Sequence, residues 1–203
     1  MKFALPERKW LIAGFVVAGL QTAALGSMVW DRIQLIRNGR EIVLPIVPVD
    51  PRSLFRGDYV ILSYEAQQVP ASLITPELDA KRPREFYVRL GKTGDNWAPV
   101  GLAEQAMPAT ADQLSVKART RFGYWQPRVV RPAGTTNNPQ REPTLQVRYG
   151  IESYFVAEGK GLALEQMARE KKLAAVIAVD ARGNAAIKGL MIDGKLQYEE
   201  PLL

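Results

Sequence analysis

One uninterrupted apolar run near the start of the chain constrains its fold more than any other feature. Residues 10–30 read WLIAGFVVAGLQTAALGSMVW and contain no charged side chain; the polar ones are Gln21, Thr22 and Ser27. About 20 apolar residues at a rise of about 1.5 Å each cross the roughly 30 Å hydrocarbon core of a bilayer. Trp10 and Trp30 stand at the two ends, where indole rings favour the headgroup level. The sequence therefore predicts a transmembrane anchor helix over residues 10–30.

Two other interpretations of this run stay open. A buried core helix would have to be apolar on every face and unusually long. A cleaved signal peptide is the second, because small residues at 24–27 resemble a cleavage site. The apolar run continues past Gly26, however, and a cleavable apolar region is usually only about 7–15 residues long. We therefore favour an uncleaved anchor.

The flanking charges give only a weak prediction of orientation. Three basic side chains precede the span and three follow it closely, so the positive-inside rule is nearly balanced: Lys2, Arg8, Lys9, Arg32, Arg37 and Arg40. A short tail before the span and the bulk of the chain after it favour an inside N-terminus. We predict a cytoplasmic tail over residues 1–9, the anchor over 10–30, and a soluble domain over 31–203 on the opposite side.

The composition excludes several classes of function. The chain has no cysteine and no histidine, which rules out disulfides, thiol catalysis, Ser-His-Asp catalysis and His- or Cys-ligated zinc. The net charge is +6, and residues 1–40 alone carry +4 of it. No basic block is interleaved with aromatic residues, so we expect no nucleic-acid binding. We also expect no metal site and no cofactor.

The rest of the chain predicts a mainly β domain. Short segments rich in β-branched and aromatic residues alternate with Pro- and Gly-rich turns. We expect antiparallel sheets or a barrel-like domain with one or two short helices (α+β), the clearest helix covering residues 162–172. The strands are expected at 41–44, 59–64, 85–90, 97–102, 115–120, 144–156, 174–179 and 185–192. The segment 59–64 is apolar on both faces, which predicts a central strand, and residues 126–143 predict a long surface excursion.

The motif RGDYVILSY at residues 56–64 supplies the first candidate site, comprising Asp50, Arg52, Arg56, Asp58, Tyr59 and Tyr64. Gly57 suits a turn that needs positive φ, and Asp58 can accept backbone N–H bonds there. Arginine and aspartate in this number can form an ion-pair cluster that fixes the loop. We interpret the set as a structural turn into a strand. A ligand-binding or catalytic role for Asp50, Arg52, Arg56 and Asp58 is the alternative.

A second candidate set lies further along the chain and comprises Glu152, Tyr154, Glu158, Gly159 and Gly161. Paired carboxylates such as Glu152 and Glu158 are suited to acid–base work or Ca²⁺ binding, but no known ligand spacing accompanies them. The glycines flank Lys160 just before the predicted helix, where an anion can bind. The P-loop pattern is absent, so a simple turn is the favoured interpretation.

Three runs in this order resemble the bacterial GDYXXLXY protein family. They are residues 48–64 with GDYVILSY at their end, residues 149–165 beginning YGIESYF, and residues 179–190 ending IKGL. The resemblance extends over roughly residues 28–192. It implies a membrane-anchored bacterial protein that works beside multi-pass membrane proteins, and it implies no established activity.

The first motif is also similar to signal-peptidase-type proteases, which carry an N-terminal anchor and a Gly-Asp pair at the start of a strand. Their nucleophilic serine lies eight residues before that glycine, and here the position is Val49. Without a hydroxyl, a lysine base has nothing to activate. A related fold without the serine stays possible, but we predict no catalytic residue.

From these observations we expect a non-catalytic accessory or interaction protein. It would sit in the bacterial inner membrane with a single pass and a periplasmic domain. Its partners would be the bilayer, through residues 10–30, and an integral membrane protein. The alternative is an envelope enzyme or ligand-binding domain that uses the cluster at residues 50–58.

Overall fold

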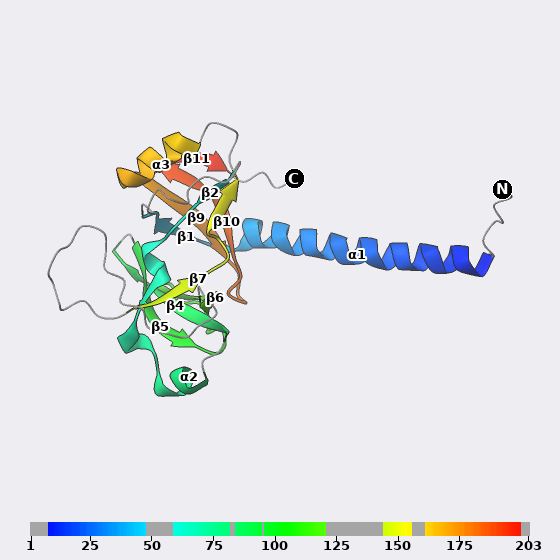
Figure 1. Cartoon of the computed structure of the whole chain (residues 1–203), viewed down its shortest axis with the longest axis horizontal. Helices are drawn as coiled ribbons and strands as arrows, with labels where there is room; N and C mark the ends of the chain where they lie inside the picture. The colour runs from blue at the N-terminus through cyan, green and yellow to red at the C-terminus, as the bar shows by residue number, and fades with distance from the viewer. Residues whose placement is uncertain are drawn as a thin grey trace.

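A computed structural model describes residues 8–47, 59–81, 84–94, 96–120, 144–155 and 161–199. A long N-terminal helix projects from a domain built of antiparallel sheets (Figure 1). The predicted mainly β class with few helices is thereby confirmed. The described strands form open sheets and do not close into a barrel.

The helices are α1 (Arg8–Asn38), α2 (Pro76–Lys81) and α3 (Gly161–Arg169), with 3-10 turns η2 (Glu65–Gln67) and η3 (Ala71–Leu73). The strands are β1 (Arg40–Pro45), β2 (Tyr59–Ile61), β3 (Gln68–Pro70), β4 (Glu85–Thr93), β5 (Asn96–Ala103), β6 (Gln113–Thr120), β7 (Thr144–Arg148), β8 (Ser153–Phe155), β9 (Leu173–Val179), β10 (Ala185–Ile192) and β11 (Lys195–Glu199).

A four-stranded sheet in the order β1-β9-β10-β11 carries the end of α1. Its register places Ile42, Ile177 and Ile187 in one row, and all three are buried in the main core. Side chains one position along the strands point to the opposite face, where Ala178 and Ala186 lie. One face of this sheet therefore covers the core, and the other receives α1.

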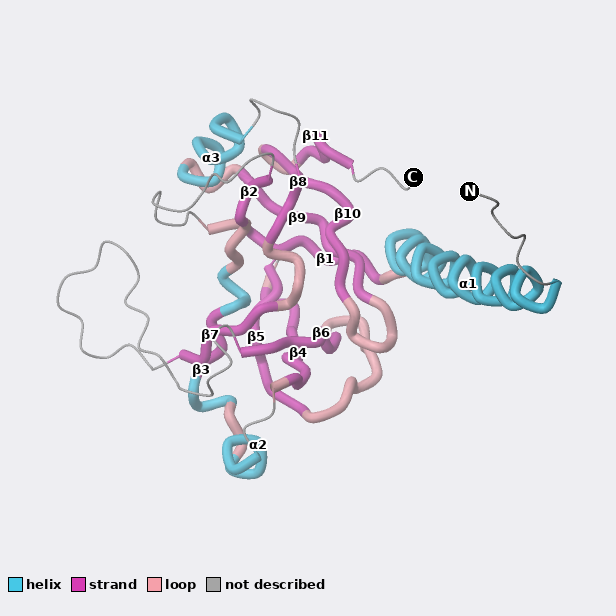
Figure 2. Tube along the Cα trace, turned by 45° about the vertical axis from the view of Figure 1, so that its right-hand side comes forward, coloured by secondary structure: helices cyan, strands magenta, loops and turns pink. Residues whose placement is uncertain are grey.

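A five-stranded sheet in the order β3-β7-β6-β4-β5 forms the other half of the domain, and β2 pairs separately with β8 (Figure 2). Phe86, Val88 and Leu90 of β4 are fully buried and belong to the same core as the isoleucine row. The Arg40 guanidinium at the start of β1 lies 5.1 Å from the ring centroid of Trp97 in β5, a cation–π contact between the two sheets.

Helix α1 enters the domain without a linker. Leu35 and Ile36, in its last turns, are buried with Ala186 on the sheet. The Gly39 N–H donates to the Leu35 carbonyl at 2.9 Å, and β1 begins at the next residue, Arg40. A Cβ at Gly39 would lie 3.0 Å from the Ala178 Cβ and would collide with the Leu35 carbonyl, so this position needs glycine.

Two expectations about individual strands are wrong. Residues 59–64 do not form a central strand, because β2 ends at Ile61 and, among the described strands, pairs only with β8; Val60, Leu62 and Tyr64 of the segment are buried in the main core. Residues 144–156 are not one strand, since Gly150, at φ +81°, turns the chain between β7 and β8. The helix that contains the predicted span 10–30 begins at Arg8 and continues to Asn38.

Other segment predictions agree with the structure. The β9–β10 hairpin has its turn at residues 180–184, where the Gly183 N–H donates to the Asp180 carbonyl at 3.0 Å. The helix predicted at 162–172 is present as α3, which begins one residue earlier, at Gly161, and ends at Arg169. The predicted excursion at 126–143 lies outside the described residues.

Candidate functional site

The first candidate set falls largely outside the described residues. Asp50, Arg52, Arg56 and Asp58 lie in the segment 48–58, so the ion-pair cluster proposed for them stays a prediction. Tyr59 begins β2, and Tyr64 lies just before η2. Of the six residues in the set, Tyr64 is the one whose side-chain environment is defined.

Tyr64 is buried, with 1% of its surface exposed, and its hydroxyl donates to the Ile151 carbonyl at 2.8 Å. Burial raises the pKa of Tyr64 well above its ordinary value, and the negative charge of Glu152 raises the pKa further. The hydroxyl is therefore a permanent hydrogen-bond donor at neutral pH. It connects the end of the first motif to the loop between β7 and β8.

Glu152, from the second candidate set, lies in that loop and is 7% exposed. Its Oε1 accepts bonds from Gln67 Nε2 at 3.0 Å and from the Tyr149 N–H at 2.6 Å. Its Oε2 accepts the Gly150 N–H at 3.1 Å. Arg148 Nε lies 3.6 Å from Oε2 at the solvent side. The carboxylate is thus saturated by donors of its own chain.

Gln67 links Glu152 to the first motif through its own side-chain hydrogen bonds. Its Oε1 accepts the Tyr64 N–H at 3.0 Å and the Ser63 hydroxyl at 3.1 Å. On the other side, the Tyr149 hydroxyl donates to the Ala66 carbonyl. Burial raises the pKa of Tyr149, and the Glu152 charge adds to the effect.

We refer to Tyr64, Gln67, Tyr149 and Glu152 as the Glu152 cluster. It joins one residue from each candidate set, brought together across 88 positions of sequence. Sequence reasoning missed Gln67 and Tyr149. The available signal for Gln67 was its place three residues after Tyr64, the spacing of a capping box, which the structure contains. Tyr149 stood in the YGIESYF run, but no local pattern marks it as a partner of Ala66.

The Glu152 cluster acts as a structural clamp, because its hydrogen bonds hold the β7–β8 loop against η2. Each oxygen of Glu152 faces N–H donors, and no buried side-chain nitrogen or oxygen in the described part of the chain lacks a partner. A general acid or base needs a lone pair or proton directed at substrate. Here those positions are occupied by the backbone of residues 149–150 and the amide of Gln67.

The other members of the second set that the structure describes lie in β8 and α3. Tyr154 is buried in β8 opposite Val60 of β2, and Gly161 is the first residue of α3. Glu158 and Gly159 lie outside the described residues. Within the described ranges, no three carboxylates gather into a group that could hold a metal ion.

Fold and cluster together define a class: a β-rich domain, clamped by a buried carboxylate, behind an N-terminal helix that is long and apolar enough to cross a membrane. The chain belongs to the GDYXXLXY family, because a family model described as "GDYXXLXY protein" matches residues 21–190. No curated protein and no solved structure matches it.

The matched region explains part of the family's signature. The leucine and the second tyrosine of the motif are Leu62 and Tyr64, and both are buried in the core. The Leu62 N–H donates to the Glu152 carbonyl at 2.8 Å. These two motif positions are therefore explained by packing and by the Glu152 cluster.

Proposed function

We propose that this protein is a membrane-anchored, non-catalytic accessory protein of the bacterial cell envelope that acts beside an integral membrane partner. In this proposal α1 crosses the inner membrane once and the domain faces the periplasm. One observation carries the proposal. The apolar window of α1 has no residue buried inside the protein, while the same helix is fixed to the sheet at its far end.

The exposure of α1 argues for a bilayer as its surroundings. Trp10, Phe15, Leu20 and Trp30 are each at least 62% exposed, and they point to different sides of the helix. Large apolar side chains exposed on every side are costly in water, and a hydrocarbon environment removes that cost. A core helix would instead be covered by the domain.

The Glu152 cluster supports a non-catalytic role. In it, the buried carboxylate stabilises the domain by tying the β7–β8 loop to η2. Removing it should unfold or loosen the domain rather than leave a folded, inactive one. This behaviour separates a clamp from a catalytic carboxylate, whose loss commonly leaves the fold intact.

Support for a membrane partner comes from small residues within the exposed span. Gly14, Ala18 and Gly19 lie in the apolar window, and a Cβ added at Gly14 or Gly19 would meet nothing within 4 Å. Small side chains let a second helix approach closely, and polar ones such as Gln21 can hydrogen-bond across the contact. Ser27 is the other polar candidate, although its hydroxyl already donates to the Ala24 carbonyl at 2.8 Å.

The test is purification of the full chain from its native membranes in a mild detergent, followed by mass spectrometry. We expect one integral membrane protein to be recovered in stoichiometric amount. Gly14→Leu and Gly19→Leu should reduce that recovery several-fold without changing the domain, because both positions are open in this chain alone. Leu20→Phe is the matched control and should retain the partner, because Leu20 is 67% exposed and lies about 120° around the helix from Gly14 and about 100° from Gly19.

Recovery of the protein alone would refute the accessory role. Orientation needs its own measurement: a tag placed after Leu203 should be accessible from the periplasm. A cytoplasmic tag would overturn the orientation and leave the anchor standing.

A further inference from the structure

The distance along α1 from the apolar span to the domain is short. Trp30 ends the apolar run, and Ile36, six residues later, is buried on the sheet. At a rise of about 1.5 Å per residue this separation is roughly 9 Å. The polar headgroup layer of one leaflet is roughly 5–8 Å thick. If α1 spans a bilayer, the domain therefore begins at the outer edge of the headgroups.

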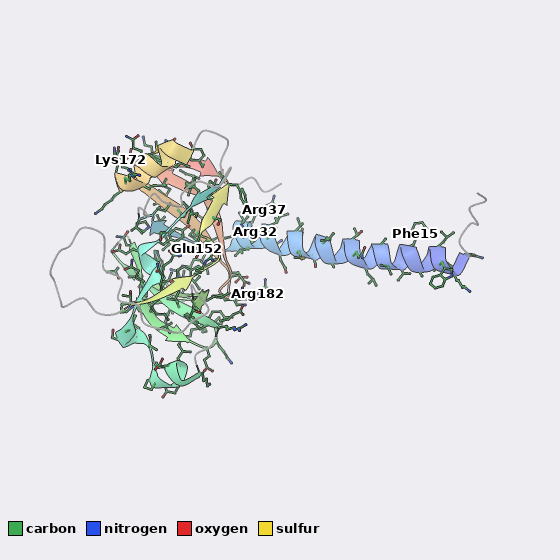
Figure 3. All side chains as sticks on the ribbon, in the orientation of Figure 1. Phe15, Arg32, Arg37, Glu152, Lys172 and Arg182 are labelled. Atoms are coloured by element: carbon green, nitrogen blue, oxygen red, sulfur yellow. The ribbon has the colours of Figure 1, made fainter. Side chains whose placement is uncertain are left out.

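Three arginines stand at this level. Arg32 and Arg37 are exposed on the last turns of α1, and Arg182 is exposed in the β9–β10 turn. Figure 3 shows all three where α1 meets the domain. Positions 32 and 37 lie about 140° apart around a helix, so the two helical arginines point to different sides. With Arg182 they form what we call the basic collar.

The direction of the helix favours contact between the collar and lipid phosphates. Side chains of an α-helix tilt toward its N-terminus, which here is the bilayer side. Arg37, the more distant helical residue, can thus extend its long stem back toward the headgroups. The ion pairs and hydrogen bonds of the described chain leave Arg32 and Arg37 without a partner.

Arg182 is held in place by its own turn. Asp180 accepts its N–H at 2.9 Å and its Nε at 3.2 Å, and also accepts the Asn184 N–H at 2.8 Å. Burial works against ionisation of Asp180, but the hydrogen bonds from Asn184 and Arg182 outweigh it and lower the pKa of that carboxyl. The Arg182 side chain stays 70% exposed. The Asp180 carboxylate therefore positions Arg182 and compensates part of the positive charge of that arginine.

A hollow of about 440 Å³ lies beside the collar, between α1 and this turn. Gln34 and Asn38 line it from the helix, and Ser115 and Arg182 line it from the sheets. Asp31 is the acidic group at its helix side. The Ser115 hydroxyl is engaged with the Met107 backbone. The Gln34 oxygen accepts from the Asn38 amide. The remaining amide N–H groups of Gln34 and Asn38 can donate to a phosphodiester beside the guanidinium.

We infer that the basic collar of Arg32, Arg37 and Arg182 binds the phosphate groups of anionic glycerophospholipids and holds the domain against the bilayer. The inference rests on the proposed function only in requiring α1 to span the membrane. A basic residue near a membrane surface contributes about a five-fold preference for anionic lipid. Arg32 and Arg37 contribute in full, and Arg182, shared with Asp180, contributes less.

The experiment uses the full chain with Trp10→Phe, reconstituted in phosphatidylcholine bilayers that contain phosphatidylglycerol. One of the two lipids carries brominated acyl chains, which quench the fluorescence of a neighbouring tryptophan. The signal of Trp30 is obtained by subtracting that of the matching Trp10→Phe, Trp30→Phe protein. Comparing the two brominated lipids gives the relative affinity of each lipid for the helix end beside the collar.

We expect phosphatidylglycerol to be preferred over phosphatidylcholine by about five-fold or more. The triple variant R32Q/R37Q/R182Q should bring the preference below about two-fold. The matched control K81Q/R169Q/K172Q also removes three positive charges, but from α2, α3 and the segment after α3, all far from α1 (Figures 1 and 3). It should keep the preference.

Equal quenching by the two brominated lipids in the parent protein would overturn the inference and leave the anchor standing. A preference that survives in R32Q/R37Q/R182Q, or disappears equally in the control, would also overturn it. No quenching of Trp30 by either lipid would overturn the inference together with the anchor itself.

Discussion

Replacing Glu152 with glutamine tests the clamp directly. The amide oxygen can keep the position of Oε1 and accept the bonds from Gln67 and the Tyr149 N–H. The amide nitrogen must then face the Gly150 N–H, which Oε2 accepts at 3.1 Å in the native protein. Two donors would oppose each other, and the remaining bonds would lose the assistance of the negative charge.

The expected cost follows from these losses. A buried donor left unsatisfied costs about 1–3 kcal/mol, and bonds to a charged group contribute about 1.5–3 kcal/mol against 0.5–1.5 for neutral ones. We therefore expect Glu152→Gln to lower the free energy of unfolding by about 3 kcal/mol. For a domain of this size the melting temperature should fall by roughly 6–12 °C.

The assay is thermal and urea unfolding of the full chain in detergent, followed by circular dichroism. Glu104→Gln is the matched control, because Glu104 is 46% exposed and pairs with Lys81 at the surface. Exposed pairs of this kind contribute roughly 0–1 kcal/mol, so the control should change little. A loss below about 1 kcal/mol in Glu152→Gln, or an equal loss in the control, would refute the clamp.

Two further predictions concern pH and the junction. The pKa values of Tyr64 and Tyr149 are raised above the ordinary 10.0 in the folded protein, so these hydroxyls lose their protons at lower pH in the unfolded chain than in the folded one. The free energy of unfolding is therefore highest below pH 10 and falls as the pH rises above it. Above pH 10 each tyrosine should lower the free energy of unfolding by up to about 1.4 kcal/mol per pH unit. Unfolding curves at alkaline pH should show that Tyr64→Phe and Tyr149→Phe each remove this dependence. An unchanged slope in these variants would contradict the burial of the two hydroxyls. Gly39→Ala should destabilise the domain by at least about 1–3 kcal/mol in urea, because its Cβ would collide with the Leu35 carbonyl. Gly14→Ala has open space around it and should leave the unfolding curve unchanged; equal effects would disprove the packing argument.

The parts of the fold that sequence predicted depend on local patterns. An apolar run of bilayer length and the β-branched and aromatic segments that form strands are each visible within the local sequence. Hydropathy defines the apolar span to Trp30 but does not show that the helix continues to Asn38, because Leu35 and Ile36 pack on a sheet that forms from residues far along the chain.

The candidate site was harder to predict because its partners are distant in sequence. Tyr64 and Glu152 were named separately; the spacing of Gln67 from Tyr64 is a local signal for one of its bonds, but nothing local indicates its bond to Glu152. Apolarity on both faces suggested a central strand at residues 59–64. The structure obtains this burial differently, through a short strand pair, β2 and β8, whose Val60 and Tyr154 lie in the main core. Local patterns report burial, but they do not report which surface provides it.

The direct passage from α1 into β1 sets an angular relation between membrane and domain. With only Gly39 between helix and strand, the domain must follow every rotation of α1 about its axis. One residue inserted between Trp30 and Leu35 would turn the domain by about 100° and lift it by about 1.5 Å. The number of residues in this short interval therefore determines which side of the domain faces a neighbour that is fixed in the same bilayer.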